Sequence, residues 1–544
     1  MTDDDGYYVI NIPKFISSLT MRLEGYNQTQ VAVSGRTDDI DAVLYSDQFL
    51  KDYSDVKATA AKSVSTEDFT TSTAITVDQE ISNRLGADVR SIQRSGIPGE
   101  GMSMFINGYN SLNSNAQPLI VIDGVVLDQL YGQTMLHNGY YNNLLQALDI
   151  KDIESVEVLK NGTAIYGAKA ANGVIVIKTK RCTSMATRID VSISGGVETR
   201  PKTLDVMNAS QYRNYASELL GSTDTKLLSF KFLNTDPNYY YYNMYHNDTD
   251  WKDEVYREAW TQDYGISIQG GDEIAEYNLS VGFMDSKSTL KMNDMQRFNI
   301  RFNTDIKLNQ YWSTSFDASY TNVTRDLRDD GLSSDFVIPA TSSPSFLAYA
   351  KSPFLSPYDF ATDGSRSNFI ADADTYLDEV IGTKASLANP TALLTNGEAK
   401  NKNYTDCTMI SLNVAPRWKP SRNFSVTERF SFSMRSFSEE YFTAIDGMPT
   451  YVDSKEQSAI SNARFSLYSK HSAVFSDTRA DWDILSDGDH RLNAFGGVRF
   501  MNDGFNSTQE TGYNTSNDKT PNGSMSETSK RIDGSDEIWR SLSY

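Results

Sequence analysis

The sequence predicts a compact α+β domain followed by a transmembrane antiparallel β-barrel. Residues 66–181 mix short helical and strand patterns, with PLIVIDGVVL, ESVEVL and GVIVIK as the clearest strands. After Arg181 polar and apolar residues alternate, which is typical of strands with one buried face. Short and long connections between these strands alternate without a break. An up-and-down barrel with tight turns at one rim and large loops at the other produces this pattern.

The alternation is clearest in RFNIRFNTDIKL, residues 297–308. One face carries apolar side chains, namely Phe298, Ile300, Phe302, Ile306 and Leu308. The other face carries charged and amide side chains. Similar segments predict about ten strands within residues 186–544. The pattern alone leaves a large secreted β-protein open as the alternative, although such a protein has no reason to segregate its loop lengths so strictly.

Size and composition restrict the classes of protein further. The 544 residues exceed one ordinary domain, so at least two units are expected. A hydrophobic fraction of 39% with 11% aromatic residues argues against wholesale disorder. The net charge of −21 makes nucleic acid a poor partner, because phosphate contacts need Lys and Arg. No apolar run is long enough for a membrane-spanning helix, whereas barrel strands need no such run.

The residues that usually carry catalysis or metals are sparse. The two cysteines, Cys182 and Cys407, cannot build a disulfide framework or a Cys-rich zinc site. The four histidines are far apart, and neither H-E-x-x-H nor an EF-hand loop occurs. We therefore predict no catalytic residue, no cofactor and no metal.

The segments before the α+β domain read as incomplete. Residues 1–36 contain two or three strand patterns, too few to close a core, and residues 37–65 read as a polar linker. The chain starts without a basic and apolar leader, and it ends at DEIWRSLSY, apparently inside a strand. We therefore expect a fragment of a longer protein.

A possible phosphate loop lies within residues 153–181, where Gly162 and Gly167 have the spacing of a Walker A motif. However, Ala168 follows the second glycine, Lys169 comes one position late, and no Ser or Thr follows it. Asn172–Gly173 is a turn pair, and the next residues form a strand pattern instead of a helix. These features favour a tightly packed strand–turn–strand unit over a nucleotide site.

Two longer blocks carry a family resemblance. PLIVIDGVVLD (118–128) and DIESVEVLKNGTAIYGAKAANGVIVIKTKR (152–181) resemble the plug domain of SusC/RagA-type TonB-dependent outer-membrane transporters of Bacteroidota. Residues 247–305 look like the start of the family barrel, and DGYYVINIP resembles the end of its carboxypeptidase-regulatory-like domain. The residues that match the plug signature are Asp123, Gly124, Glu154, Glu157, Tyr166, Gly167, Asn172 and Gly173.

The resemblance implies an importer in the outer membrane, not an enzyme. Its domains would be 1–36, the end of the regulatory-like domain; 37–65, a linker; 66–181, the plug; and 186–544, the first part of a barrel. A family barrel has 22 strands, of which this chain would supply about ten. The implied partners are TonB with its motor proteins, a SusD-like lipoprotein, outer-membrane lipid, and an oligosaccharide or, in some members, a peptide. The rival hypothesis is a non-transporting surface-binding protein or a decayed transporter fragment.

Two sets of residues are candidate contacts. The TonB box would be DAVLY, which is Asp41, Ala42, Val43, Leu44 and Tyr45, and a plain linker is the alternative. The substrate contacts would be the aromatic residues Tyr239, Tyr240, Tyr241, Tyr242, Tyr245 and Trp251, because aromatic faces stack on sugar rings. The alternative is that these tyrosines pack the loop or belong to an aromatic girdle.

Overall fold

The computed structural model describes residues 7–13, 18–21, 29–33, 40, 61–65 and 73–544 of the chain. Within the last range it leaves out 129–134, 138, 183–185, 221–229, 273, 329–342, 372–386, 396–402, 422, 446, 448, 450, 453–458, 488–489 and 515–529.

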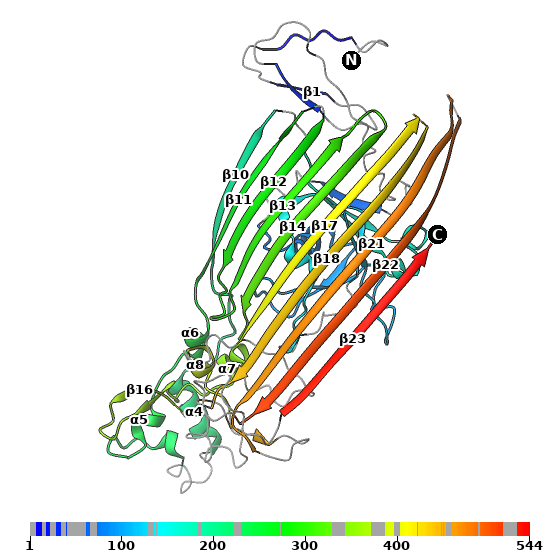
Figure 1. The fold of residues 1–544 in the computed structure, drawn as a ribbon. Helices are drawn as coiled ribbons and strands as arrows, with labels where there is room; N and C mark the ends of the chain where they lie inside the picture. The colour runs from blue at the N-terminus through cyan, green and yellow to red at the C-terminus, as the bar shows by residue number, and fades with distance from the viewer. Residues whose placement is uncertain are drawn as a thin grey trace.

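The largest element is a ten-stranded antiparallel sheet, here called the wall, whose strands pair in chain order (Figure 1). Its strands are β10 (Arg188–Glu198), β11 (Ala259–Gly271), β12 (Ala275–Ser286), β13 (Met295–Lys307), β14 (Trp312–Asp326), β17 (Tyr404–Ser421), β18 (Phe424–Thr443), β21 (Ala463–Asp487), β22 (His490–Tyr513) and β23 (Lys530–Ser543). β10 and β23 are its two edges, so the described sheet is open. The predicted barrel strands are confirmed.

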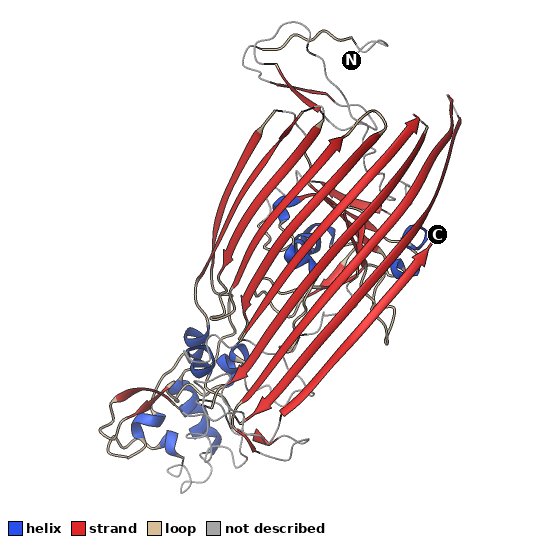
Figure 2. Ribbon diagram, in the orientation of Figure 1, coloured by secondary structure: helices blue, strands red, loops and turns tan. Residues whose placement is uncertain are grey.

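The two rims of the wall differ as predicted. At one rim, tight turns join neighbouring strands, such as residues 308–311 between β13 and β14. At the other rim the long connections carry the helices, which gather there in Figure 2. These helices are α4 (Ala209–Leu220), η7 (Lys231–Leu233), α5 (Tyr242–Tyr245), α6 (Trp251–Val255), α7 (Pro344–Ala350) and α8 (Pro390–Thr395). The same loops hold the short strands β15 (Tyr358–Phe360), β16 (Arg366–Ile370), β19 (Tyr451–Val452) and β20 (Ala459–Ile460).

The plug is a separate α+β unit on the inner side of the wall, behind it in the view of Figure 1. Its five-stranded sheet has the order β3-β8-β9-β6-β7. The strands are β3 (Ala61–Ser65), β6 (Leu119–Ile122), β7 (Val125–Leu127), β8 (Ile153–Leu159) and β9 (Val174–Thr179). The other plug elements are α2 (Val77–Leu85), β4 (Arg90–Ile92), β5 (Ser103–Phe105), η3 (Leu144–Ala147), η4 (Ile150–Asp152), α3 (Thr163–Tyr166) and η5 (Ala168–Ala170).

The plug sheet starts earlier than the boundary expected at residue 66. β3 lies inside the segment expected to be a linker, and it pairs with β8 from Ala61↔Leu159 to Ser65↔Ser155. Its sequence, AKSVS, is short and mostly polar, so it carries little hydrophobic pattern. Backbone pairing along an existing strand edge places it in the sheet.

Two further strands precede the plug. β1 (Ser18–Met21) and β2 (Thr29–Ala32) form a small antiparallel pair beside the tight-turn rim (Figure 1). Among the described helices, none is long and apolar enough to cross a bilayer.

The two faces of the wall have opposite polarity. On β13, Phe298 and Ile300 are each 37% exposed on the outer face, whereas Arg297 is 1% exposed on the inner face. Asn299 and Arg301 are likewise buried on the inner face, against the plug. This apolar exterior around a polar interior is the arrangement of a membrane β-barrel.

The plug nevertheless has a hydrophobic core of its own. Residues of α2, β6, β7, β8 and β9 supply more than half of it, with Val156, Ile175 and Ile177 fully buried, and other plug segments such as η3 supply most of the rest. From the wall, only Met409, Phe475 and Met501 join this cluster among the described buried residues. The plug therefore folds around its own strands and docks onto the wall mainly through other contacts.

Because the outer face is apolar, a charged residue there should destabilise the barrel, and more so the closer it lies to the middle of the membrane. Phe302→Arg places a cation in the middle of the apolar band and should destabilise the full-length barrel by about 2–4 kcal/mol. Leu308→Arg lies on the same face at the tight-turn rim and should cost about 0–1 kcal/mol. Urea unfolding in detergent micelles measures both, and equal costs would contradict a lipid-facing outer surface.

Candidate functional site at the plug–wall interface

The plug signature residues Asp123 and Gly124 form a tight turn between β6 and β7. Their φ values are 49° and 78°, which fits the left-handed positions of a type I′ hairpin turn. The Asp123 carboxylate accepts hydrogen bonds from the Thr179 backbone N at 2.9 Å and from Thr179 Oγ1 at 2.8 Å. The turn is thereby fixed to the end of β9.

This turn presses directly against the wall. Arg429 of β18 donates through Nη1 to the Gly124 carbonyl at 3.3 Å. A Cβ atom at Gly124 would lie 2.3 Å from Arg429 Nη1, so no larger residue fits there without movement. Arg301 Nη1 lies 3.8 Å from Asp123 Oδ2 on the same side. Two wall arginines therefore cover the turn.

A second polar cluster lies at η4. Arg297 Nη2 is 3.4 Å from Asp149 Oδ1, and Arg301 Nε is 3.6 Å from Asp152 Oδ2. Burial raises the pKa of the Asp152 carboxyl and the nearby Asp149 adds to the rise, while Arg301 opposes it. Two arginines and two aspartates thus meet where burial makes the ionised form of Asp152 costly.

These polar contacts leave several hydrogen-bonding groups of the arginines unsatisfied. Arg297 Nε and Nη2 and Arg301 Nε have no hydrogen-bond partner among the described residues. Beside them lies a cavity of about 20 Å³, bordered by Asp123, Leu127 and Asn413, which is large enough for one water molecule. Water can therefore exchange into this part of the interface more cheaply than into an apolar contact.

The last residues of the plug are anchored at a third point. Arg181 bridges two wall carboxylates, with Nη1 2.9 Å from Asp305 Oδ1 and Nη2 2.7 Å from Asp317 Oδ1. Asn278 and Asn303 donate to the Lys180 carbonyl, each at 2.9 Å. Here too the contacts between plug and wall are polar.

A carboxylate clasp holds the plug at the long-loop end. Glu439 of β18 is fully buried and accepts from the Leu136 backbone N at 2.7 Å and the His137 backbone N at 2.9 Å. His137 Nδ1 lies 2.6 Å from the same carboxylate, and the Tyr441 ring packs edge-on against the imidazole. One wall side chain therefore fixes two consecutive plug residues.

The candidate phosphate loop serves packing instead. Lys169 Nζ lies 2.5 Å from Asp128 Oδ2 and 3.3 Å from the centre of the Trp539 ring on β23. Cation–π contacts of this kind add modest stability. The lysine therefore pairs with a carboxylate of the plug itself and contacts the wall through the Trp539 ring.

The other signature residues are placed within the same loop and strand. Tyr166 is buried, and Gly167 and Gly173 have φ values of 72° and 90°. Asn172 donates to the Asn115 carbonyl at 2.8 Å. On β8, Glu154 is exposed and Glu157 is half-buried.

The aromatic substrate candidates mostly pack the loop. Tyr245 and Trp251 are each 2% exposed in a cluster with Phe232 and Phe354, so they cannot offer a free face to a sugar. Their sequence neighbours interact with one another: Tyr239 and Tyr240 contact the Tyr241 ring, and Tyr242 stacks on His246 at 4.0 Å. Only Tyr240, at 72% exposure, presents a large open surface among them. The TonB-box candidate, residues 41–45, lies outside the described residues.

Sequence reasoning missed the wall side of this interface. Arg297, Arg301 and Arg429 hold the plug, as does Glu439. The available signal was the recurrence of arginine at alternate positions in RFNIRFN, opposite an apolar face. That signal identifies the lumen face but not the plug residues that meet it.

The comparisons with known proteins agree with this architecture. Residues 55–174 match the family model described as TonB-dependent Receptor Plug Domain. The chain is 34% identical to TonB-dependent receptor SusC of Bacteroides thetaiotaomicron over 220 residues, 40% of this chain and 20% of that protein. It is 27% identical to TonB-dependent receptor P26 of Formosa agariphila over 439 residues, 78% of this chain and 39% of that protein.

Among solved structures, the RagAB peptide transporter matches with a TM-score of 0.65 at 19% identity, over 89% of this chain and 53% of that chain. This likeness concerns the fold. The chain thus spans about half or less of the length of the relatives it matches.

A plug docked inside an amphipathic barrel wall, together with the matched plug model, defines a TonB-dependent receptor. The matches support a receptor of the SusC/RagA type, a class whose β-barrels lie in the outer membrane.

Because Arg429 lies so close to Gly124, adding a methyl group at this position should disturb the contact between plug and wall. Gly124→Ala should force Arg429 away and expose the plug to protease in the full-length protein, beyond the ~1–2 kcal/mol that a positive φ costs any L-residue. Gly108→Ala is the matched control, because its φ is 80° and nothing lies within 4 Å of its Cβ position. Equal protease sensitivity of the two variants would contradict the contact with the wall.

Removing the Glu439 carboxylate should reduce the protection of the Leu136 and His137 amides from hydrogen exchange. Glu439→Ala leaves two buried backbone N–H groups without an acceptor and should ease local opening of residues 136–137 by about 1–3 kcal/mol. Glu439→Gln keeps an acceptor and should lose less. Hydrogen exchange measures both, with Ser438→Ala on the outer face as control, and unchanged exchange in Glu439→Ala would count against the clasp.

Proposed function

We propose that the chain is the plug and the first part of the barrel of an importer, which takes up an oligosaccharide with TonB and a SusD-like lipoprotein. The long-loop rim faces the exterior, and the tight-turn rim, with β1 and β2, faces the periplasm. The complete protein acts as a transporter and not as an enzyme. One observation supports this most strongly: the plug has its own core but is docked through polar contacts.

This separation suits a gate. Force applied to the chain ahead of Ala61 acts first on β3, which is an edge strand of the plug sheet. The polar contacts of Asp149, Asp152 and Arg181 with the wall can exchange for water as the plug shifts, because ions and amides keep favourable partners in water. The apolar core around β8 and β9 loses only its contacts with Met409, Phe475 and Met501 of the wall in such a shift. Opening therefore requires movement at the interface and not unfolding of the whole plug.

The proposed cargo is an oligosaccharide, which the family resemblance of the sequence implies. Tyr240 is the exposed aromatic residue that could stack on a sugar ring at the long-loop rim. A surface-binding protein without transport activity is the alternative, and it requires no movement of the plug. The next experiment separates these two functions.

A disulfide across the interface should block uptake reversibly. Thr179→Cys combined with Asn303→Cys joins β9 to the wall at a site where the native side chains are 3.1 Å apart. In the full-length gene, with Cys182 and Cys407 replaced by serine, we expect oxidised cells to lose uptake and reduced cells to regain it. The two single-cysteine variants are the controls. Normal uptake with the disulfide verified as formed would contradict plug movement.

The TonB box is tested separately. Val43→Pro or Leu44→Pro removes a backbone donor and bends the strand that would pair with TonB, so uptake should be abolished while surface expression is retained. Ser46→Pro, just outside the candidate segment, is the control. Unchanged uptake in the Val43 and Leu44 variants would assign residues 41–45 to a plain linker.

A further inference from the structure

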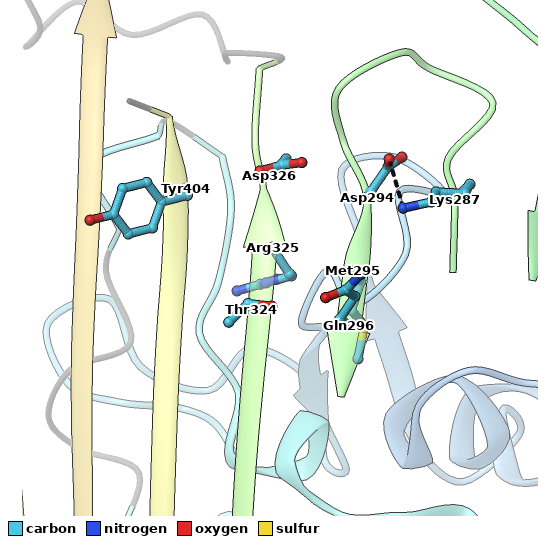
Figure 3. Close-up of a pocket in the computed structure, with 8 residues that line it drawn as sticks. All are labelled: Lys287, Asp294, Met295, Gln296, Thr324, Arg325, Asp326 and Tyr404. Carbon is cyan, nitrogen blue, oxygen red and sulfur yellow. Dashed lines mark ion pairs between the residues drawn. The ribbon is translucent and has the colours of Figure 1, made fainter. Parts of the chain in front are cut away.

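A polar cavity opens on the outer side of the wall near its long-loop rim (Figure 3). Its volume is about 290 Å³, close to the lower end of the range for small-ligand sites. Six of its lining residues come from the outer face or the rim, namely Lys287, Asp294, Gln296, Thr324, Asp326 and Tyr404, and the inward-facing Met295 and Arg325 complete it. They come from β12, β13, β14 and β17 or from the residues just beyond them.

The cavity is separate from the route through the barrel. Arg325 alternates with Thr324 and Asp326 on β14, and it points to the inner face, where it donates to the Gly99 carbonyl of the plug. On β13 the buried Arg297 likewise faces the plug, while Gln296 is exposed on the opposite face. The plug lies behind the strands in Figure 3. A molecule passing through the lumen would therefore not meet this cavity.

The depth of the cavity places it at the membrane surface. Outward-facing apolar residues extend over Trp312–Tyr320 on β14 and Ile410–Trp418 on β17, about nine residues each, which is the length that crosses the hydrocarbon region. The first outward residues beyond them are polar, and Asn322 donates to Thr408 Oγ1 at 3.0 Å. The cavity begins one outward position further along, at Thr324. It therefore lies level with the headgroups of the outer leaflet.

The charges around the cavity disfavour a phosphate. Lys287 Nζ lies 3.2 Å from Asp285 Oδ1 and 3.5 Å from Asp294 Oδ2. Arg257 Nη2 contacts Asp294 at 2.5 Å. Lys287 and Arg257 are thus already neutralised by carboxylates, and Arg325 directs its guanidinium to the Gly99 carbonyl of the plug. Asp326 adds a further negative charge.

The same lining suits a sugar. Asp294 and Asp326 offer carboxylate acceptors, and Gln296 offers an amide. The hydroxyls of Thr324 and Tyr404 have no hydrogen-bond partner in the part of the chain that the structure describes. Tyr404 is 36% exposed and is a lining residue, although its ring extends away from Thr324 and Asp326 in Figure 3. Sugar hydroxyls both donate and accept, and the apolar face of a sugar ring packs on an aromatic ring.

We propose that this cavity binds the sugar headgroup of a glycolipid in the outer leaflet of the membrane. The cavity continues the apolar, lipid-facing band directly beneath it, so the acyl chains of the occupant would lie along Tyr320 and Ile410 while the sugar enters the cavity. The site is independent of the import function and requires only the assembled barrel.

Photocrosslinking of the full-length protein tests the proposal. A benzophenone amino acid replaces Thr324, and the protein is placed in nanodiscs of phosphatidylcholine with a minor share of a diglycosyl diacylglycerol. We expect the glycolipid to be labelled several-fold above its share of the lipid. The matched control carries the probe at Phe316, on the same face of β14 within the apolar band, and should label both lipids in proportion.

Two further measurements sharpen the outcome. Asp326→Ala in the Thr324-probe protein should remove the enrichment while heat-modifiable gel mobility shows that the barrel is still folded. Labelling in proportion at Thr324 would overturn the proposal. Loss of the glycolipid adduct on addition of the free disaccharide would show that the cavity recognises the sugar headgroup. Preferential labelling of phosphatidylglycerol in place of the glycolipid would identify a phosphate site instead.

Discussion

The opposite polarity of the two faces of the wall is the constraint on which the rest of the structure depends. The outer face must be apolar because it meets lipid, so strand alternation gives the inner face to polar side chains. Arg297, Arg301 and Arg429 consequently project toward the plug. The plug can meet this surface only with matching polar groups, and it does so with Asp123 and Asp149.

The structure thereby separates folding from docking. Burial of apolar surface within the plug, around Val156 and Ile175, stabilises its fold. Ion pairs between the plug and the wall contribute specificity more than strength, because desolvation offsets much of their attraction. Shape also fixes the position of the plug on the wall, because the Asp123–Gly124 turn fits under Arg429 only when residue 124 has no side chain. A domain held this way has a defined position that does not depend on sharing its core with the wall.

Local patterns predicted much of this structure, and long-range partners lay beyond them. Period-2 alternation located the wall strands, and the loop lengths assigned the two rims correctly, because both depend on neighbouring residues. The sequence pattern did not predict β3, because AKSVS has no apolar stripe. Its position depends on backbone pairing with the edge of β8. The clasp joins residues 302 positions apart, His137 and Glu439, so no local pattern could reveal it. The aromatic run around Tyr245 looked like an exposed platform, although tertiary packing buries much of it.

Polar contacts hold a plug whose own core is apolar, so the clasp and the core should open separately. Amide hydrogen exchange of the full-length protein in nanodiscs measures both. Leu136 and His137, which donate to a wall carboxylate, should exchange by local opening and faster than Val156 and Ile175 in β8 and β9. Equal protection at the clasp and in the plug core would mean that both open as one unit, contrary to a plug that is docked separately from its own core.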